Sequence, residues 1–293
     1  MRRLIVLIGL LLAAPLSAAA LEVAATTPNM GMLARTVGGE HVRVTVLAPG
    51  DRDVHHLEAR PSMMVALRRA DLLVAIGAEL EVGWLPAAVR GAGNPRLLPG
   101  RPGYFEAAAA VTLIDGGAPA DRALGDVHPM GNPHLYFDPL RMAVAGTALA
   151  ERLAELDPPR AAVYAENAAA FATRMEHAVA DWSARASAAP GVLLYHRDAD
   201  YLMRRLGVSV LGYLEPLPGI PPSARHLQQL AAGLRGSDGI VFHMVYEPAR
   251  GPGRIARELG WPVHRMHNNV PPDGTAESYL ELIEGWVARL ERR

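Results

Sequence analysis

Residues 158–187 read PPRAAVYAENAAAFATRMEHAVADWSARAS, and this stretch decides the fold. The two prolines suit the first turn of a helix, and the pattern behind them predicts one helix from Pro158 to about Ser187. At 1.5 Å per residue such a helix is roughly 45 Å long, far longer than a typical globular helix. It is therefore either one long core helix or a rigid strut between two lobes.

Strand-like and helical segments alternate on both sides of this stretch. Before it we expect strands at 22–27, 42–48, 72–76 and 111–114, and helices at 29–37, 61–69, 80–90 and 139–156. After it we expect strands at 192–195, 208–214, 239–243 and 262–266, and helices at 199–206, 223–234, 253–259 and 277–290. Strands separated by helices at this spacing favour parallel, doubly wound sheets. The sequence therefore predicts an α/β fold of two such lobes joined by one long rigid helix.

The first twenty residues predict a leader for export. Arg2 and Arg3 form a positive start, residues 4–16 are apolar but short for a membrane span, and residues 17–20 (SAAA) are typical of a cleavage site. We therefore expect a protein of the periplasm with the following parts: a signal peptide at 1–20, an N-terminal lobe at 21–156, a linking helix at 157–189 and a C-terminal lobe at 190–293.

The composition excludes several kinds of chemistry. The chain has no cysteine, so disulfides, thiolate zinc ligands and a cysteine-linked lipid anchor are excluded. All 29 basic residues are arginine, which excludes Schiff-base chemistry and a P-loop lysine. Without Arg2 and Arg3, 27 of these remain against 30 acidic residues, a balance that does not indicate binding to nucleic acid or to an anionic membrane. His, Asp and Glu remain as the strong metal ligands.

Three histidines lie in similar contexts. His55, His134 and His196 each follow an expected strand or turn and precede an expected helix. In an α/β fold, loops at such places converge at the edges of the sheets. Several neutral imidazoles at one point are typical of a transition-metal site. One such histidine alone is more often a structural side chain, so the prediction depends on all three converging.

Seven segments carry a specific resemblance. In chain order they are VGGEHVRV at 37–44, DVHHLE at 53–58 with Pro61-Ser62, ADLLV at 70–74 with Glu79 and Trp84-Leu85, NPHLYFDP at 132–139, Tyr195-His196, EPLPGIPPS at 215–223, and Tyr279-Leu280. Together they resemble the solute-binding proteins of zinc and manganese ABC transporters, known as cluster A-I, in that family's order and over nearly the whole chain after the leader. In this class a single long helix joins two lobes, and their angle changes little on metal binding.

The resemblance implies that His55, His134 and His196 are metal ligands, with His56 only as the neighbour of His55. The class usually takes a fourth ligand, an aspartate, from the loop between the last strand and the last helix. That loop reads MHNNVPPDGTAE here, at 266–277, and contains one aspartate. We therefore expect Asp273 as the fourth ligand. The alternatives are Glu277, His243, His267 and a water molecule.

Ligand chemistry favours Zn2+ over Mn2+ as the transported ion. Three imidazoles and one carboxylate form a nitrogen-rich site, whereas manganese sites of this class carry two carboxylates and two histidines. Zinc also accepts the tetrahedral geometry that four ligands allow. The resemblance thus implies a monomer that captures zinc and delivers it to an inner-membrane ABC permease, with a periplasmic metallochaperone as a further candidate partner. The alternatives are a manganese-binding protein of the same class, a zinc-dependent hydrolase, and an adhesin-like or metal-sensing protein; we expect no enzyme.

Two further segments carry hypotheses. The loop at 116–131 contains His128, Asp121 and Asp126 and is similar to a short form of the His- or acid-rich loop of zinc members. It is either a weak site for metal capture or a plain surface connection. In EPLPGIPPS, the prolines restrict the backbone, and Glu215 either orients a ligand imidazole or pairs with an arginine.

Overall fold

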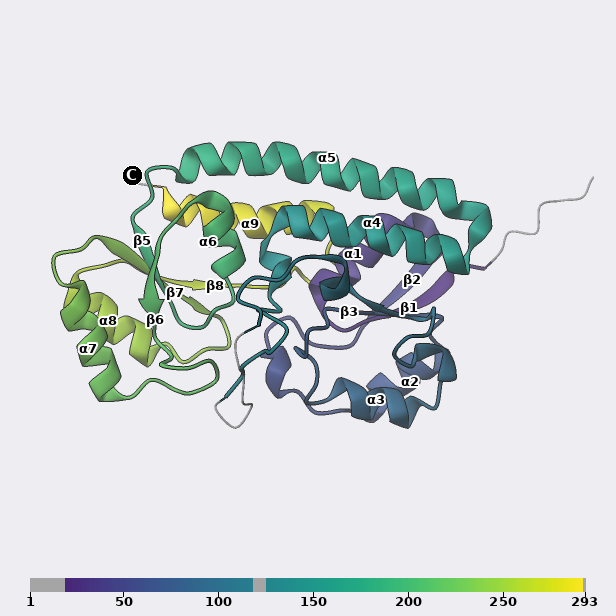
Figure 1. Ribbon diagram of the computed structural model, residues 1–293, viewed down its shortest axis with the longest axis horizontal. Coiled ribbons are helices and arrows are strands. Elements are labelled where there is room, and N and C mark those ends of the chain that lie inside the picture. Colours follow the sequence, from purple (N-terminus) through teal and green to yellow (C-terminus); the bar gives the residue numbers. More distant parts are fainter. Residues whose placement is uncertain (1–18, 118–124, 292–293) are drawn as a thin grey trace, which may run out of the picture.

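Two four-stranded sheets, each entirely parallel, form the centres of two lobes in the computed structural model (Figure 1). The structure describes residues 19–117 and 125–291. The first sheet has the order β2-β1-β3-β4 and consists of β1 (Leu21–Ala25), β2 (Val42–Val46), β3 (Leu72–Ala75) and β4 (Tyr104–Glu106). The second has the order β6-β5-β7-β8 and consists of β5 (Gly191–Leu194), β6 (Val210–Tyr213), β7 (Gly239–Met244) and β8 (Val263–Met266). Every residue of β3 and β7 is buried, because helices cover both faces of a parallel sheet.

Helices connect and cover these strands, which confirms the α/β class. In the first lobe they are α1 (Pro28–Gly38), α2 (Pro61–Arg69), α3 (Leu85–Ala92) and α4 (Pro139–Leu156). In the second lobe they are α6 (Asp200–Leu206), α7 (Ala224–Leu234), α8 (Arg250–Leu259) and α9 (Ala276–Leu290). The strand expected at 111–114 is wrong, since β4 lies at Tyr104–Glu106 instead. Three residues are too few to show a period, and the apolar side chains at 111, 113 and 114 pack against the core without strand pairing.

The long helix is present and spans both lobes. Pro158–Arg160 form a 3-10 turn, and α5 (Ala161–Ala186) continues for 26 residues, about 39 Å. Figure 1 shows α5 lying along both lobes, and its neighbours are α1 and α4 of the first lobe and α6 and α9 of the second. Its buried face carries Tyr164, Phe171, Met175, Val179 and Trp182. The prediction of one long helix between two sheets is therefore confirmed.

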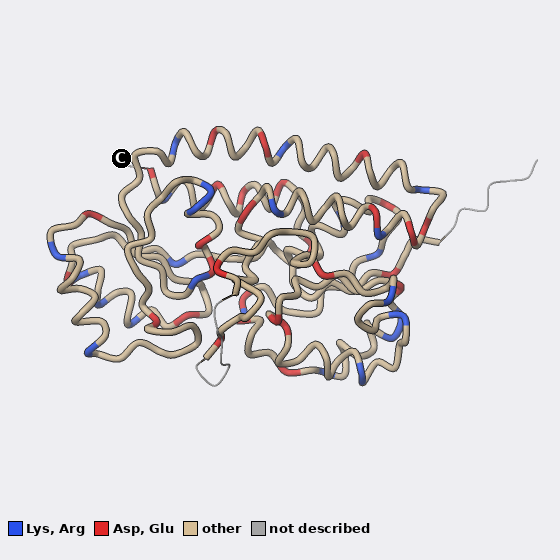
Figure 2. Tube along the Cα trace, viewed as in Figure 1, with Lys and Arg blue, Asp and Glu red and all other residues tan. Residues whose placement is uncertain are grey.

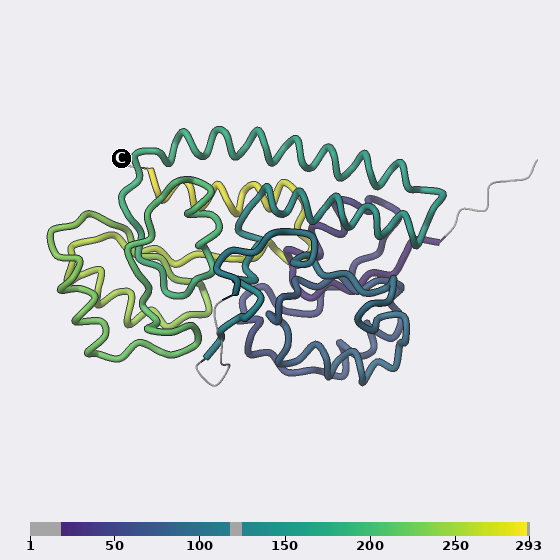
Figure 3. The backbone as a smooth tube through the Cα atoms, viewed as in Figure 1, coloured from purple at the N-terminus to yellow at the C-terminus, as the bar shows by residue number. Residues whose placement is uncertain are grey.

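Side chains from both lobes share one core, which limits how far the lobes can move apart. Figure 3 shows the chain leaving β8, crossing to the first lobe and returning through α9 along α5. Tyr279 of α9 donates a hydrogen bond to the carbonyl of Tyr136 at 2.7 Å. Arg205 of α6 donates two hydrogen bonds, at 3.0 and 2.8 Å, to Asp138, the residue that caps α4. These contacts join the two lobes directly.

The predicted leader, 1–20, lies almost entirely outside the described residues. Within the described residues, no helix has the length and apolar character needed to cross a membrane. The predicted limits at 156 and 190 place one sheet before α5 in the chain and the other after it. The apolar core, however, continues across both sheets.

Candidate metal centre

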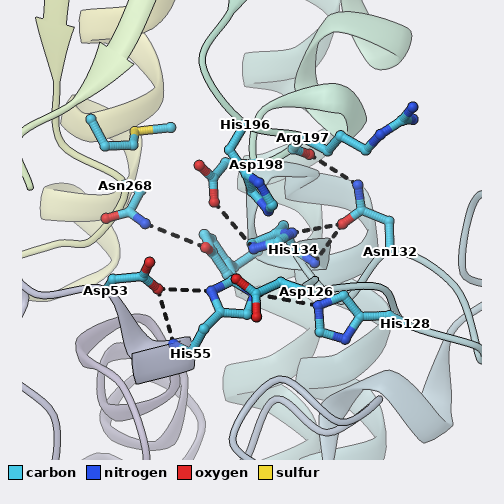
Figure 4. A network of polar contacts seen from close by, with 12 residues as sticks. Asp53, His55, Asp126, His128, Asn132, His134, His196, Arg197, Asp198 and Asn268 are labelled. Atoms are coloured by element: carbon cyan, nitrogen blue, oxygen red, sulfur yellow. Dashed lines mark hydrogen bonds and ion pairs between the residues drawn. The ribbon is translucent and has the colours of Figure 1, made fainter. Parts of the chain in front are cut away.

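Loops from both lobes bring His55, His134 and His196 together (Figure 4). His55 lies in a 3-10 turn after β2, and His134 directly precedes another such turn before α4. His196 lies two residues beyond the end of β5. Because loops after parallel strands gather at the carboxyl edges of their sheets, these histidines from distant parts of the chain can face one another.

The three imidazoles have the spacing of a single metal site. One ring nitrogen of each lies within 4.8 Å of those of the other two. The ring centroids are 5.2 Å apart for His55 and His134, 5.3 Å for His134 and His196, and 5.6 Å for His55 and His196. The side chains are only 8%, 1% and 10% exposed, in chain order. Nearly equidistant, shielded rings are what a tetrahedral ion requires from three of its four ligands.

Two of these rings are oriented by a residue two positions earlier in the chain. Oδ1 of Asp53 lies 2.7 Å from Nδ1 of His55 and also accepts the backbone N–H of His55. Oδ1 of Asn132 lies 2.8 Å from Nδ1 of His134 and accepts the backbone N–H of His134. Because Nδ1 is occupied in both rings, Nε2 is the nitrogen left for a metal.

The third ring is oriented from the segment 215–223. Oε2 of Glu215 lies 2.8 Å from Nδ1 of His196, which confirms the interpretation of Glu215 as a residue that orients an imidazole. The same oxygen accepts the backbone N–H of Gly219 at 2.9 Å. Gly219 has a φ of 77°, a conformation that favours glycine, so this turn brings its N–H onto Glu215. Ser223 caps α7, since its Oγ accepts the N–H of His226 at 3.2 Å.

Burial and neighbouring charges give the histidines different affinities for a proton. Burial opposes the ionisation of Asp53, but the hydrogen bond and the charge of His55 outweigh it and lower the pKa of Asp53 to about 2. Burial likewise lowers the pKa of His55, but Asp53 outweighs burial, and the pKa of His55 is raised. Burial and then the charge of His55 lower the pKa of His134 well below its ordinary value. His134 is therefore a neutral ring, whereas protons compete with a metal more strongly for His55.

A cavity of about 300 Å³ beside the imidazoles is strongly acidic. Its walls carry five carboxylates and no arginine: Asp53, Asp126, Asp198, Glu215 and Glu247. Figure 2 shows acidic positions where loops of the two lobes meet. The pKa of Glu247 is raised to about 8 by burial and by the charges of Glu215 and Asp53. Such a cavity favours the approach of a cation.

The loop at 116–131 reaches the same place. Nε2 of His128 lies 3.3 Å from Nε2 of His55, and Oδ2 of Asp126 lies 3.3 Å from Nε2 of His56. Asp121, the third residue named for this loop, lies outside the described residues. The loop therefore puts at least one further imidazole beside the three, as a capture site would require.

Asp198 is a site residue that the sequence patterns did not indicate. Its Oδ1 lies 3.1 Å from Nε2 of His134, and its side chain is 2% exposed. Burial, then the charges of Glu247 and Asp53, raise the pKa of Asp198 well above its ordinary value. The only local signal is the spacing His196-x-Asp198, which is also common at the start of a helix.

The structure does not place Asp273 with the three imidazoles. Asp273 is exposed, and its loop is tied to α1 because Arg35 donates hydrogen bonds to the carbonyls of Pro272 and Gly274. The expectation that Asp273 is the fourth ligand therefore has no support from the geometry.

The alternative protein ligands are also absent from the group of three among the described residues. Glu277 is exposed and pairs with Arg174 at 2.8 Å, and His267 is exposed. His243 is buried in β7, where its Nδ1 lies 3.1 Å from the carbonyl of Met244.

Comparisons with known proteins cover both lobes. The sequence model of the family described as "Zinc-uptake complex component A periplasmic" matches residues 23–293. The high-affinity zinc uptake system protein ZnuA of Yersinia pestis is 24% identical over 244 residues, 77% of this chain and 76% of that protein. A crystal structure of ZnuA is similar with a TM-score of 0.75 at 23% identity, over 92% of this chain and 98% of the other. The solute-binding protein FpvC of Pseudomonas aeruginosa in complex with Mn2+ has a TM-score of 0.75 at 25% identity, over 91% and 95% of the two chains.

Proposed function

Because the chain belongs to the family of the periplasmic component A of zinc-uptake complexes, we propose that it captures zinc and delivers the ion to an ABC-type importer. His55, His134 and His196 are the proposed ligands. The observation that carries the proposal is the convergence of one ring nitrogen from each within 4.8 Å. The orienting contacts at all three Nδ1 atoms support it, because ligand histidines in metalloproteins almost always have such a partner.

The class of the protein is established, whereas the identity of its metal ion is a proposal. The chain is a metal-binding solute-binding protein of cluster A-I, a component of metal uptake by an ABC transporter and not an enzyme. A zinc-dependent hydrolase is therefore no longer an alternative.

Zinc is the proposed cargo rather than manganese. One relative of this fold was solved with Mn2+, so the fold alone does not choose the ion. Three imidazole nitrogens support zinc, because manganese prefers oxygen ligands and softer nitrogen-rich sites suit zinc. The remaining expectations are part of the same proposal: a signal peptide at 1–20, lobes at 21–156 and 190–293 joined through 157–189, a monomeric state, an inner-membrane permease as partner and a periplasmic metallochaperone as donor.

Metal titration tests the ligand set. Metal-stripped protein should bind one zinc ion more tightly than manganese in competition with a chelating dye. Each of His55→Ala, His134→Ala and His196→Ala should weaken zinc binding by on the order of 100-fold or more, since each removes one of about four ligands. His177→Ala, an exposed position on α5, is the matched control and should bind as the unmodified protein does. Wild-type affinity in all three site variants would refute the ligand assignment, and tighter manganese binding would refute the choice of ion.

Growth tests the transport role. A strain that lacks this protein should grow poorly when zinc is chelated, and added zinc should restore growth where added manganese does not. Rescue by manganese alone would support the manganese-binding alternative.

A further inference from the structure

One carboxylate oxygen of Asp198 is buried without a hydrogen-bond partner. Asp198 lies between β5 and α6, and its Oδ1 is 3.1 Å from Nε2 of His134 (Figure 4). Its other oxygen, Oδ2, is buried and accepts no hydrogen bond. Nε2 of His134 is also buried without a hydrogen bond, although Oδ1 of Asp198 lies only 3.1 Å away. Buried carboxylates are costly unless a cation or a set of donors compensates them.

The surroundings of Asp198 favour a cation beside its carboxylate, because the charges nearest to it are negative. The charged groups that act most strongly on it are carboxylates: Glu247, Asp53, Glu215 and Asp200. Arg197, its neighbour in sequence, is directed to Asp115 and Asp200 instead, at 3.7 and 3.8 Å. Thus an acidic group is held among other acidic groups, beside the imidazole of His134, whose Nε2 is available to a metal.

We propose, on the basis of the zinc-binding function above, that Asp198 supplies the fourth ligand and that one of its carboxylate oxygens completes a site of three nitrogens and one oxygen. Zinc bonds of about 2.0–2.2 Å in a tetrahedron separate neighbouring donor atoms by about 3.3 Å. The observed 3.1 Å between Asp198 Oδ1 and His134 Nε2 is close to that separation.

If Asp198 is the fourth ligand, the loop at 266–277 does not have to supply a carboxylate. Figure 4 labels Asn268 of this loop near the site; Asn268 is buried and carries an amide. That amide donates to the hydroxyls of Tyr246 at 2.8 Å and Tyr136 at 3.4 Å, so it serves as a donor within the protein.

His128 is the competing fourth ligand. Its Nε2 lies 3.3 Å from Nε2 of His55, which equals the expected separation of two zinc donors. Its ring, however, lies 6.3 Å from that of His134, whereas the three central rings are separated by 5.2–5.6 Å. Asp198 is almost fully buried and directly faces the ring that His128 fails to approach, so the geometry favours Asp198.

The test compares two buried aspartates that lie two residues apart. Asp198→Asn should weaken zinc binding by on the order of 100-fold, and the melting temperature of the metal-free protein should stay level or rise, because an uncompensated carboxylate is removed. Asp200→Asn is the matched control: Asp200 accepts the hydroxyl of Tyr213 at 2.9 Å, so this variant should melt earlier and retain zinc affinity. Zinc affinity within about threefold of wild type in Asp198→Asn overturns the proposal.

Spectroscopy of the unmodified protein gives an answer even if Asp198→Asn does not fold. X-ray absorption of the zinc-loaded protein should show three imidazoles and one oxygen, and four imidazoles would overturn the proposal in favour of His128. The outcomes for the proposed function are distinct. If Asp198→Asn retains zinc but the three histidine variants lose it, only the fourth ligand is wrong. If the histidine variants also retain zinc, the proposed function itself is wrong.

Discussion

Removing the carboxylate of Glu215 should weaken zinc binding by about 10- to 100-fold, because Glu215 holds the ring of His196 in place. Oε2 of Glu215 contacts Nδ1 of His196 at 2.8 Å and the N–H of Gly219 at 2.9 Å. The side chains of Glu215 and His196 are 12% and 10% exposed, so water can replace the lost acceptor only poorly. The substitution therefore disturbs a proposed ligand, His196, without removing it.

Two independent estimates agree on the size of this effect. In Glu215→Ala, the Nδ1–H of His196 stays buried without an acceptor, which costs about 1–3 kcal/mol. A loss of 10- to 100-fold in metal affinity corresponds to about 1.4–2.7 kcal/mol. Glu215→Gln retains an oxygen acceptor but loses the charge. Since a hydrogen bond to a charged group is worth about 1 kcal/mol more than a neutral one, we expect about a fivefold loss.

Chelator competition at neutral pH measures both variants beside a control. Glu258→Gln removes a carboxylate that makes only a surface pair with Arg235 at 3.4 Å, and it should bind zinc as the unmodified protein does. The expected order of affinity is Glu258→Gln, Glu215→Gln, Glu215→Ala and, weakest, His196→Ala. If Glu215→Ala binds zinc within about twofold of the unmodified protein while His196→Ala binds weakly, the reasoning about Glu215 is refuted.

Three more predictions concern the lobe interface, pH and the loop. Asp138→Ala should destabilise the metal-free protein by about 2–3 kcal/mol, somewhat less than for a fully buried pair because Arg205 is 30% exposed; an unchanged midpoint of urea unfolding would contradict this. The rise in melting temperature caused by zinc should grow with pH. Because the pKa of His55 is raised, its contact with Asp53 stabilises the metal-free protein at low pH, and this stabilisation is lost as the pH rises through that pKa. Over the same range, protons cease to compete with zinc for His55. Melting curves with and without zinc from about pH 5.5 to 8 check the sign, and a rise independent of pH would be inconsistent with it. Shortening residues 116–131 should leave equilibrium zinc affinity nearly intact but slow uptake from a donor complex, whereas loss of tight binding would identify His128 as a ligand.

The fold could be predicted from the sequence because its signals are local. Buried strands such as β3 appear as short apolar runs, and prolines mark the first turns of α1, α2 and α4. The strand β4 was missed because it is three residues long and pairs with β3 through its backbone rather than through a side-chain pattern.

The three histidines and two of their orienting partners could also be found locally. Asp53 and Asn132 each lie two residues before the histidine that they orient, so a single turn builds each pair. Glu215 could be named as a candidate, but 19 residues separate it from His196, and only the pairing of β5 with β6 brings the two together.

The sequence by itself determined the α/β class, the long helix and the three imidazoles, since each depends on residues that are close in the chain. The tertiary structure decided which carboxylate lies beside them. Asp273 lies in the loop where the family usually supplies its ligand, yet Arg35 of α1 ties that loop down 237 to 239 residues away in sequence. Asp198, in contrast, meets His134 only because α6 and the turn before α4 pack together across the lobes. Which acidic group lies beside His134 depends on such long-range packing, and the spacing His196-x-Asp198 alone does not reveal it.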